Sequence, residues 1–234
     1  MESKRLPGKP LIDICGKPLL QWTYEQAKKT KADGVYVATG DEEIKKHCRA
    51  NRIPLLVTEG YFPNGTARCA QVMLDLLSTE WYSKGEINVV VNWQVDEPLV
   101  DPNVVNEMFC SLYLHPLRIS TLVARHCGWY HSNEVVKVIV SNENSTSKAE
   151  CHWFTRNHIP YALYHCGVYA FRPRILKRIL SLEVTSASAF ESLEQLTWLE
   201  HGFSITPIVM HELPISINDP KDVRKLQNHL KDKL

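Results

Sequence analysis

The run INVVVNWQVDEP, residues 87–98, decides the fold. Its first part, 87–93, is the most strand-like segment of the chain and is close to continuously apolar, which is typical of a central parallel strand buried on both faces. The polar residues 94–98 follow directly, and ligands of open α/β sheets bind beyond the carboxyl ends of the strands. This placement predicts that Asp96 takes part in chemistry, although Asp-Glu-Pro also forms ordinary turns at strand ends.

Upstream of this strand, helical and strand-like patterns alternate. Strands are predicted at 11–15, 35–39 and 54–58, and helices at 19–30, 41–51 and 66–77. Thr66 follows a Pro-Asn-Gly turn and is the expected N-cap of the third helix. Alternating strands and helices favour parallel pairing, with helices on both faces of the sheet.

Downstream, strands and helices are predicted to follow in a less regular order. The strands are expected at 119–124, 135–140, 152–155, 164–171 and 205–209, and the helices at 101–114, 173–182, 190–201 and 221–233. This half resembles a mixed or antiparallel extension of the first sheet, over roughly 135–172. Gly202 is expected at the C′ position of its helix, and Asn218-Asp219-Pro220 is expected to cap the last helix.

The composition limits the class of protein. With 234 residues, 44% of them hydrophobic, the chain is long enough to form one large domain over 1–234. Lys and Arg number 27 against 26 Asp and Glu, which excludes the broad cationic surface typical of nucleic-acid-binding proteins. The seven cysteines include no C-x-x-C pair and indicate reduced thiols in a cytoplasmic protein. No apolar run approaches the length of a membrane span.

A basic turn, SKRLPGKPL at 3–11, stands near the start of the chain. Pro7 fixes its own φ and Gly8 can take a positive φ, so the segment predicts a turn between Arg5 and Lys9. Cationic side chains and backbone N–H groups around such a turn can hold an oxyanion such as phosphate. A solvated basic loop is the alternative interpretation.

Eight motifs spread over the chain resemble those of one enzyme family. They are RLPGKPL (5–11), GKP (16–18), NGTAR (64–68), NWQVDEP (92–98), FTRNHIP (154–160), HCGVY (165–169), LEQL (193–196) and DPKD (219–222). In this order they are similar to the 3-deoxy-manno-octulosonate (Kdo) cytidylyltransferases, also called CMP-Kdo synthetases. The similarity runs from Ser3 nearly to the C-terminus, which makes it far more specific than a single glycine-rich loop.

The resemblance implies both a fold and a reaction. The fold is an α/β nucleotidyltransferase three-layer sandwich with a mostly parallel central sheet, and a smaller sheet extension makes a homodimer. The reaction joins CTP and Kdo to give CMP-Kdo and pyrophosphate, for lipopolysaccharide or cell-surface polysaccharide synthesis. Mg²⁺ is the implied cofactor, because charge on the phosphate oxygens must be neutralised.

The resemblance also assigns roles to individual residues. Lys9 and Arg5 are expected to grip the triphosphate and Asp96 to hold Mg²⁺, so Lys9 and Asp96 should converge on the same CTP. The residues expected to contact the nucleotide are Ser3, Gly65, Thr66, Arg68 and Gln94. Those expected to contact the sugar acid are Arg156, His165, Tyr169, Glu194 and Gln195.

The assignments to the sugar acid compete with structural interpretations. Arg156 is the natural clamp for the sugar carboxylate, because its planar fork matches a carboxylate bidentately. Taken without the resemblance, however, Tyr169 is a strand aromatic of the core, His165 a strand histidine with satisfied hydrogen bonds, and Glu194 an exposed helix acid.

The chain departs from the family pattern in the nucleotide region. Members of the family begin with an apolar strand that ends in Pro-Ala-Arg, so we expect Met1 to be an internal methionine and the natural chain to start upstream. Val95 replaces a glycine, and its branched side chain should crowd the ribose contact. Ala67 stands where the family usually has Glu, and the segment 160–165 is shorter than usual, which alters the rim of the sugar pocket.

A further departure concerns the second magnesium ligand. The family has Val-Asp-Thr-Pro where this chain has Ile217-Asn218-Asp219-Pro220, so Asn218 takes the place of the carboxylate. A neutral amide still offers an oxygen but removes a full charge, which should weaken Mg²⁺ binding. Asp219 can substitute only if the turn shifts by one residue, and otherwise it caps the final helix.

Two other functions stay open. A homologue that has lost catalysis could serve as a binding or dimer-partner protein, as Val95, Asn218 and the missing first strand suggest. A cytidylyltransferase that accepts another sugar acid, such as amino-Kdo or a sialic acid, is the second alternative.

Overall fold

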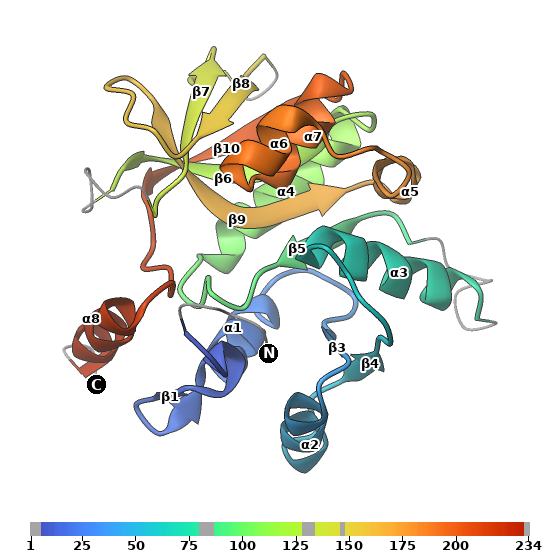
Figure 1. The fold of residues 1–234 in the computed structure, drawn as a ribbon, viewed down its shortest axis with the longest axis vertical. Helices are drawn as coiled ribbons and strands as arrows, with labels where there is room; N and C mark the ends of the chain where they lie inside the picture. The colour runs from blue at the N-terminus through green and yellow to red at the C-terminus, as the bar shows by residue number, and fades with distance from the viewer. Residues whose placement is uncertain (1–5, 80–86, 128–133, 146–147, 232–234) are drawn as a thin grey trace. The chain divides into compact units, whose positions relative to one another are not determined.

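The computed structural model describes residues 6–79, 87–127, 134–145 and 148–231 (Figure 1). The chain forms two compact units, each assembled from separate stretches of sequence. Unit 1 comprises residues 1–61, 93–103 and 214–234, and unit 2 comprises residues 62–92 and 104–213. One domain over 1–234 stays a prediction.

Unit 1 is built from short strands and helices. Its elements are η1 (Lys9–Leu11), β1 (Asp13–Ile14), β2 (Lys17–Pro18), α1 (Leu19–Ala27), β3 (Val37–Thr39), α2 (Glu42–Ala50), β4 (Leu55–Val57) and α8 (Pro220–Lys231). β1 pairs with β2 antiparallel, and β3 pairs with β4 parallel. Two apolar clusters hold these elements together, one around Leu19, Ile217 and Leu226 and one around Leu20 and Cys48.

The strand predicted over 11–15 is present only at Asp13–Ile14. The structure has η1 followed by a hairpin of β1 and β2 in this region. Gly8 (φ 69°) and Gly16 (φ 82°) both adopt the left-handed backbone that glycine takes without steric cost, so the chain turns at both places. Only Asp13–Ile14 is left to form a strand between the turns.

Unit 2 contains the large sheet. Its elements are α3 (Gly65–Leu77), β5 (Val90–Trp93), α4 (Pro102–Leu114), β6 (Ile119–His126), β7 (Lys137–Ser141), β8 (Glu150–Thr155), β9 (Leu163–Phe171), α5 (Pro173–Ile179), α6 (Ser186–Glu191), α7 (Glu194–Glu200) and β10 (Ile205–Glu212). The strands form one six-stranded sheet in the order β5-β9-β6-β10-β8-β7, and β9 also pairs with β7. Helices α6 and α7 pack together, and α7 packs against β8 (Figure 1).

This sheet is mixed, which corrects the mostly parallel sheet that was predicted. β6 and β10 are parallel, whereas β9 is antiparallel to β6 and β7, and β8 is antiparallel to β7 and β10. A short connection such as that between β7 and β8 reverses the chain and gives antiparallel neighbours. The antiparallel character predicted for 135–172 is therefore confirmed for β7, β8 and β9.

The prediction that 87–93 forms a central strand is also wrong. Within the described part of the chain, β5 begins at Val90 and lies at one edge of the sheet, next to β9. Val90 packs against the main apolar core of unit 2, which includes Tyr169, Phe171 and Trp198. The polar Asn92 is the one buried residue of β5 and the other three are partly exposed, so this apolar run indicated neither deep burial nor a central position.

The helix predicted over 190–201 is two helices. Ser192 has a left-handed backbone (φ 55°, ψ 47°), which ends α6, and α7 begins at Glu194. Ser188 Oγ donates to the Leu193 carbonyl at 2.9 Å and stabilises this corner. Gly202 has a φ of 77° directly after the C-cap of α7, as predicted.

Other helix boundaries follow the predicted signals with one exception. Asn64, rather than Thr66, caps α3, because the Asn64 side chain accepts from the Ala67 N–H at 2.8 Å. Pro220 opens α8, and Asp219 accepts from the N–H groups of Lys221 and Asp222, as a capping residue does. Across the described ranges, no helix is both long and apolar enough to cross a membrane.

Candidate active site

Lys9 and Asp96 meet in unit 1, as the sequence predicted. The Lys9 ammonium lies 2.7 Å from Asp96 Oδ2 and donates to the Ile217 carbonyl at 3.0 Å. The side chains are 13% and 20% exposed, so the pair is partly shielded from water but still accessible. Gly8, with its positive φ, starts the turn that aims Lys9 at this position. Their roles toward a nucleotide stay predictions.

The turn that carries Asp96 is held on several sides. The Glu97 N–H donates to the Gln94 carbonyl at 3.2 Å, and the Thr23 hydroxyl donates to the Val95 carbonyl at 2.7 Å. The Val95 side chain packs against both apolar clusters of unit 1. The Ile217 N–H donates to the Asp96 carbonyl at 2.9 Å, which brings residues 217 and 218 next to Asp96 along the backbone.

The two candidates for the second metal ligand differ in their surroundings. Asp219 uses Oδ1 to cap α8, with distances of 2.6 Å to the Lys221 N–H and 3.0 Å to the Asp222 N–H. The backbone N–H groups of Asn218 and Asp219 both donate to Asp222 Oδ2, at 2.9 and 3.1 Å. Oδ1 of Asp219 is therefore engaged at the helix end, and Asn218 follows directly after the residue that contacts Asp96.

The oxygens around Lys9 are of the kind that Mg²⁺ prefers. Asp96 Oδ2 and the Ile217 carbonyl already hold one cation, the Lys9 ammonium, between them. A carboxylate and a backbone carbonyl are hard donors that suit Mg²⁺ with retained water, and the next residue, Asn218, carries an amide oxygen of the same chemical kind. Among the described residues, no group of three or more His, Cys, Asp or Glu side chains could hold a metal, and Asp96 is the carboxylate that contacts Lys9.

A polar cluster in unit 2 joins the start of α3 to the start of α7. The Thr66 hydroxyl donates to Glu194 Oε1 at 2.9 Å and accepts from Asn92 Nδ2 at 3.1 Å. Gly65 leaves room for Asn92, because a Cβ at this position would come within 3.3 Å of the amide nitrogen. Thr66 is 1% exposed and Asn92 is 4% exposed, so the cluster is buried.

Glu194 has one oxygen without a partner. Within the described part of the chain, Glu194 Oε2 is buried and accepts no hydrogen bond. Burial raises the pKa of the Glu194 carboxyl to about 7, and the Thr66 hydrogen bond opposes this rise. Burial, with a smaller contribution from Glu194, raises the pKa of the Cys69 thiol to about 12, so Cys69 is not a nucleophile. Glu194 is thus a buried acceptor: its Oε1 belongs to the polar cluster and its Oε2 has no hydrogen-bond partner among the described residues.

The raised pKa of Glu194 predicts how stability depends on pH. The folded protein binds the Glu194 proton more tightly than the unfolded chain, so stability is full below about pH 4.5 and falls as pH rises through about 7. Glu194→Gln mimics the protonated acid and should remove about 3 kcal/mol of this decline, as measured by urea unfolding at about pH 4 and about pH 8. Glu183→Gln, at an exposed site, is the matched control. Equal declines in the two variants would contradict the assignment.

His165 and Tyr169 lie on β9 in contact with each other. Their ring centroids are 5.2 Å apart, and Tyr169 also packs edge-on against Trp198 at 5.0 Å. Burial lowers the pKa of the His165 imidazole to about 3, so the ring is neutral. Burial, with Glu194 as a further cause, raises the pKa of the Tyr169 phenol well above its usual value. Tyr169 is a core aromatic in this structure, as its alternative interpretation held.

Arg156 is engaged by protein groups. Its Nε donates to the Glu191 carbonyl at 3.3 Å, and its Nη1 donates to the Glu134 carbonyl at 3.1 Å. The Glu191 carboxylate accepts from the Arg156 N–H and from the Thr155 hydroxyl. The fork of Arg156 is therefore ordered, and the role of carboxylate clamp stays a prediction.

The remaining predicted residues are less informative. Arg68 stacks over the Phe62 ring at 4.8 Å, and Gln195 is 2% exposed beside Glu194 in α7. Gln94 contributes its carbonyl to the turn before Asp96. Ser3 and Arg5 lie outside the described residues.

Three residues of these sites were not among the predicted ones. Asn92 and Asp222 belong to quoted motifs, and Asp222 could have been found from its position three residues after the helix cap, where capping boxes place an acid. Ser216, which donates to Glu97 Oε2 at 2.7 Å, carries no signal in the sequence.

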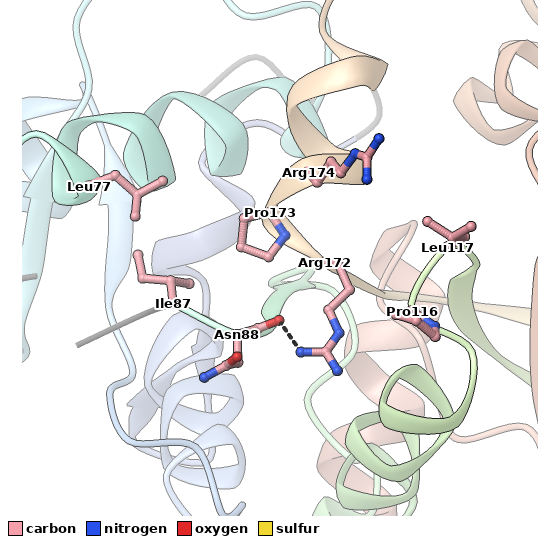
Figure 2. A pocket seen from close by; sticks show the side chains of 8 residues that line it. All are labelled: Leu77, Ile87, Asn88, Pro116, Leu117, Arg172, Pro173 and Arg174. Atoms are coloured by element: carbon pink, nitrogen blue, oxygen red, sulfur yellow. Dashed lines mark hydrogen bonds between the residues drawn. The ribbon is translucent and has the colours of Figure 1, made fainter.

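An open hollow of about 530 Å³ lies elsewhere in unit 2 (Figure 2). It is lined by Leu77, Ile87, Asn88, Pro116, Leu117, Arg172, Pro173 and Arg174. Arg172 donates to the Asn88 carbonyl at 3.1 Å. The Arg174 side chain points away from Asn88 in Figure 2. None of the predicted site residues lines this hollow, so it is separate from the two sites above.

Comparisons with known proteins identify the family. A family model described as cytidylyltransferase matches residues 1–206. The chain is 36% identical over 218 residues to a 3-deoxy-manno-octulosonate cytidylyltransferase of Vesicomyosocius okutanii, with 87% of this chain and 84% of that protein covered. It is 35% identical over 245 residues to the enzyme of the same name from Polynucleobacter asymbioticus, with 96% and 91% covered.

A solved structure agrees with these relatives. It is described as CMP:2-keto-3-deoxy-manno-octonic acid synthetase complexed with CTP, and it superimposes with a TM-score of 0.83 at 28% identity, over 99% of this chain and 95% of that one. A second structure, a cytidylyltransferase from Leptospira borgpetersenii, shares the fold with a TM-score of 0.60 at 16% identity. The resemblance stated from the motifs is confirmed, and the chain belongs to the 3-deoxy-manno-octulosonate cytidylyltransferase family.

Proposed function

We propose that this protein transfers CMP from CTP to Kdo and releases pyrophosphate, supplying an activated sugar for lipopolysaccharide or cell-surface polysaccharide. The anomeric hydroxyl oxygen of Kdo attacks the α-phosphorus, the bond from that phosphorus to the bridging oxygen breaks, and the hydroxyl proton passes to water. The observation that carries the proposal is the 2.7 Å contact between Lys9 and Asp96, which unites a cation for phosphate and a carboxylate for metal in one site.

Lys9 changes partner in this reaction. Without ligand its ammonium neutralises Asp96, and with CTP bound it turns to the triphosphate together with Arg5, while Ser3 and Gln94 contact the nucleotide. Asp96, Asn218 and the Ile217 carbonyl would then hold Mg²⁺, whose charge stabilises the phosphate oxygens during transfer. No side chain of the protein forms a covalent bond to the substrates, because positioning and charge stabilisation suffice for phosphoryl transfer.

Unit 2 supplies the groups assigned to the nucleoside and the sugar acid. Gly65, Thr66 and Arg68 are assigned to the nucleoside, and Thr66 also fixes one oxygen of Glu194. The unpartnered Glu194 Oε2 is a free acceptor for a sugar hydroxyl. Because the pKa of Glu194 is about 7, the carboxyl is partly neutral at physiological pH, which reduces repulsion from the anionic sugar. The remaining residues assigned to the sugar acid are Arg156, His165, Tyr169 and Gln195.

The setting of the reaction is also proposed from the family resemblance. We place the enzyme in the cytoplasm, as its reduced cysteines suggest, and infer a three-layer sandwich that dimerises through the extension at 135–172. Size-exclusion chromatography with light scattering tests the dimer, because it measures the molar mass of the eluting protein. A dimer should give twice the 26.8 kDa of one chain.

Pyrophosphate release tests the function directly. The protein is mixed with CTP, Mg²⁺ and one acceptor at a time, namely Kdo, amino-Kdo or a sialic acid. We expect the fastest release with Kdo. Faster pyrophosphate release with another acceptor would show that this acceptor, rather than Kdo, is the substrate. If pyrophosphate is released with none of the acceptors and calorimetry detects no metal-dependent CTP binding, the protein is a catalytically impaired homologue. The replacement of a carboxylate by Asn218 would agree with that result.

Asn218→Asp should restore the missing charge of the metal site. We expect this variant to lower the Mg²⁺ concentration at half-maximal velocity about tenfold, because a carboxylate binds Mg²⁺ more strongly than an amide does. Asp219→Asn is the matched control, since asparagine caps a helix as well as aspartate does. A higher Mg²⁺ requirement in Asp219→Asn would instead identify Asp219 as the ligand.

A further inference from the structure

A buried carboxylate next to Asp96 has no role in the reaction proposed above. Glu97 is 6% exposed, and its Oε2 accepts from the Ser216 hydroxyl at 2.7 Å. Its backbone is also fixed, because the Glu97 carbonyl accepts from Trp93 Nε1 at 2.9 Å. Burying a carboxylate is costly unless it is hydrogen-bonded, so the contact with Ser216 is a strong and specific one.

This contact is one of three successive links between two segments of unit 1. Glu97 bonds to Ser216 through side chains, Asp96 accepts from the Ile217 N–H at 2.9 Å, and Lys9 bridges Asp96 Oδ2 and the Ile217 carbonyl. Residues 213–218 are in neither a helix nor a strand, so no sheet ladder fixes their register. The side chain of Ser216 therefore adds a fixed point directly before the backbone bond of Ile217 to Asp96.

The other end of the segment is tied to α8. The N–H groups of Asn218 and Asp219 donate to Asp222 Oδ2, and Ile217 is fully buried in an apolar cluster. Ile217 and Asn218 therefore lie between two anchors, Ser216 on Glu97 and the start of α8. Loosening the first anchor leaves the second in place, so the segment can shift without unfolding.

We infer that the Ser216–Glu97 hydrogen bond positions the Ile217 carbonyl and the backbone of Asn218 beside Asp96 for cation binding. Ser216 and Glu97 are positioning residues and touch no substrate. The inference rests on the proposed function for its consequence in turnover, but its effect on cation binding is independent of turnover.

The test uses Ser216 rather than Glu97, because Glu97 has further interactions. Ser216→Ala removes the hydroxyl, and Ser216→Thr keeps it. Mn²⁺ serves as the probe, and its binding to the protein in the presence of CTP is followed by electron paramagnetic resonance. We expect Ser216→Ala to weaken Mn²⁺ binding and to raise the Mg²⁺ concentration at half-maximal velocity about five- to tenfold. The kcat at saturating Mg²⁺ should change less than about twofold, and Ser216→Thr should restore the Mg²⁺ requirement.

A matched control separates positioning from general stability. Ser181→Ala removes another serine hydroxyl bond, the one that Ser181 donates to the Arg178 carbonyl at 2.9 Å in unit 2. If Ser216→Ala and Ser181→Ala lower kcat and the thermal midpoint alike while Mn²⁺ binding is unchanged, the role is structural and the inference is wrong. Failure of Ser216→Thr to restore Mn²⁺ binding also contradicts it, as does the absence of Mn²⁺ binding by the unaltered protein. A lack of pyrophosphate release by the unaltered protein contradicts only the proposed reaction.

Discussion

Asp96→Asn is expected to slow pyrophosphate release about 10²- to 10³-fold, the loss that follows removal of a charge-stabilising group from an active site. Asp96 is the only side-chain carboxylate that contacts Lys9 among the described residues. An amide at this position neither attracts Mg²⁺ with a full charge nor holds the Lys9 ammonium by an ion pair. Initial rates at saturating CTP and Kdo over a series of Mg²⁺ concentrations measure the effect.

The control for this variant lies in the same unit. Asp101→Asn removes the same charge from an exposed acid that accepts from the Asn103 N–H at the start of α4, where asparagine substitutes well. Asp101→Asn should react at the unaltered rate. If the two variants differ by less than about twofold, Asp96 is not a metal ligand of this reaction.

Lys9→Met is expected to reduce the rate by about 10²- to 10³-fold while it strengthens the binding of metal alone. Removing the ammonium takes a cation from the triphosphate, which lowers the rate. It also frees Asp96 Oδ2 and the Ile217 carbonyl, the two oxygens that Lys9 occupies without ligand. Mn²⁺ without nucleotide should therefore bind more tightly to Lys9→Met than to the unaltered protein, as calorimetry can measure.

Lys45→Met is the matched control for Lys9. Lys45 is a buried lysine of unit 1 that pairs with Glu42 at 2.6 Å and belongs to none of the family motifs. Its replacement should leave both the rate and Mn²⁺ binding unchanged. Tighter Mn²⁺ binding in both variants, or in neither, would show that Lys9 and the metal do not compete for Asp96.

Much of the fold could be predicted from local signals. Pro220 at the start of α8 and Gly202 after α7 were correctly placed, because proline and glycine have narrow structural uses at helix ends. The break at Ser192 was not predicted, since a serine in the left-handed conformation depends on contacts such as the Ser188 hydrogen bond. The edge position of β5 was missed for a similar reason, because strand order is set by tertiary contacts rather than by composition.

The candidate site shows the same division. The meeting of Lys9 and Asp96, which are 87 residues apart, followed from a rule about strand ends and from the family motifs. The bond between Thr66 and Glu194 spans 128 residues, and the bond between Ser216 and Glu97 spans 119. No local pattern encodes such pairs, since each side chain taken alone is an ordinary polar residue. Sequence therefore predicted which residue types converge but not the contacts that hold them in place.

The hydrogen bond between His165 and Thr121 fixes more than a ring orientation. The Thr121 hydroxyl donates to the Val168 carbonyl at 2.9 Å, so it must accept from His165 Nε2, which lies 3.0 Å away. The proton of the neutral imidazole is thereby assigned to Nε2, and Nδ1 presents a lone pair. Any group that meets that nitrogen must donate a hydrogen bond to it. Because burial lowers the pKa of the imidazole to about 3, this preference for a donor does not change over physiological pH.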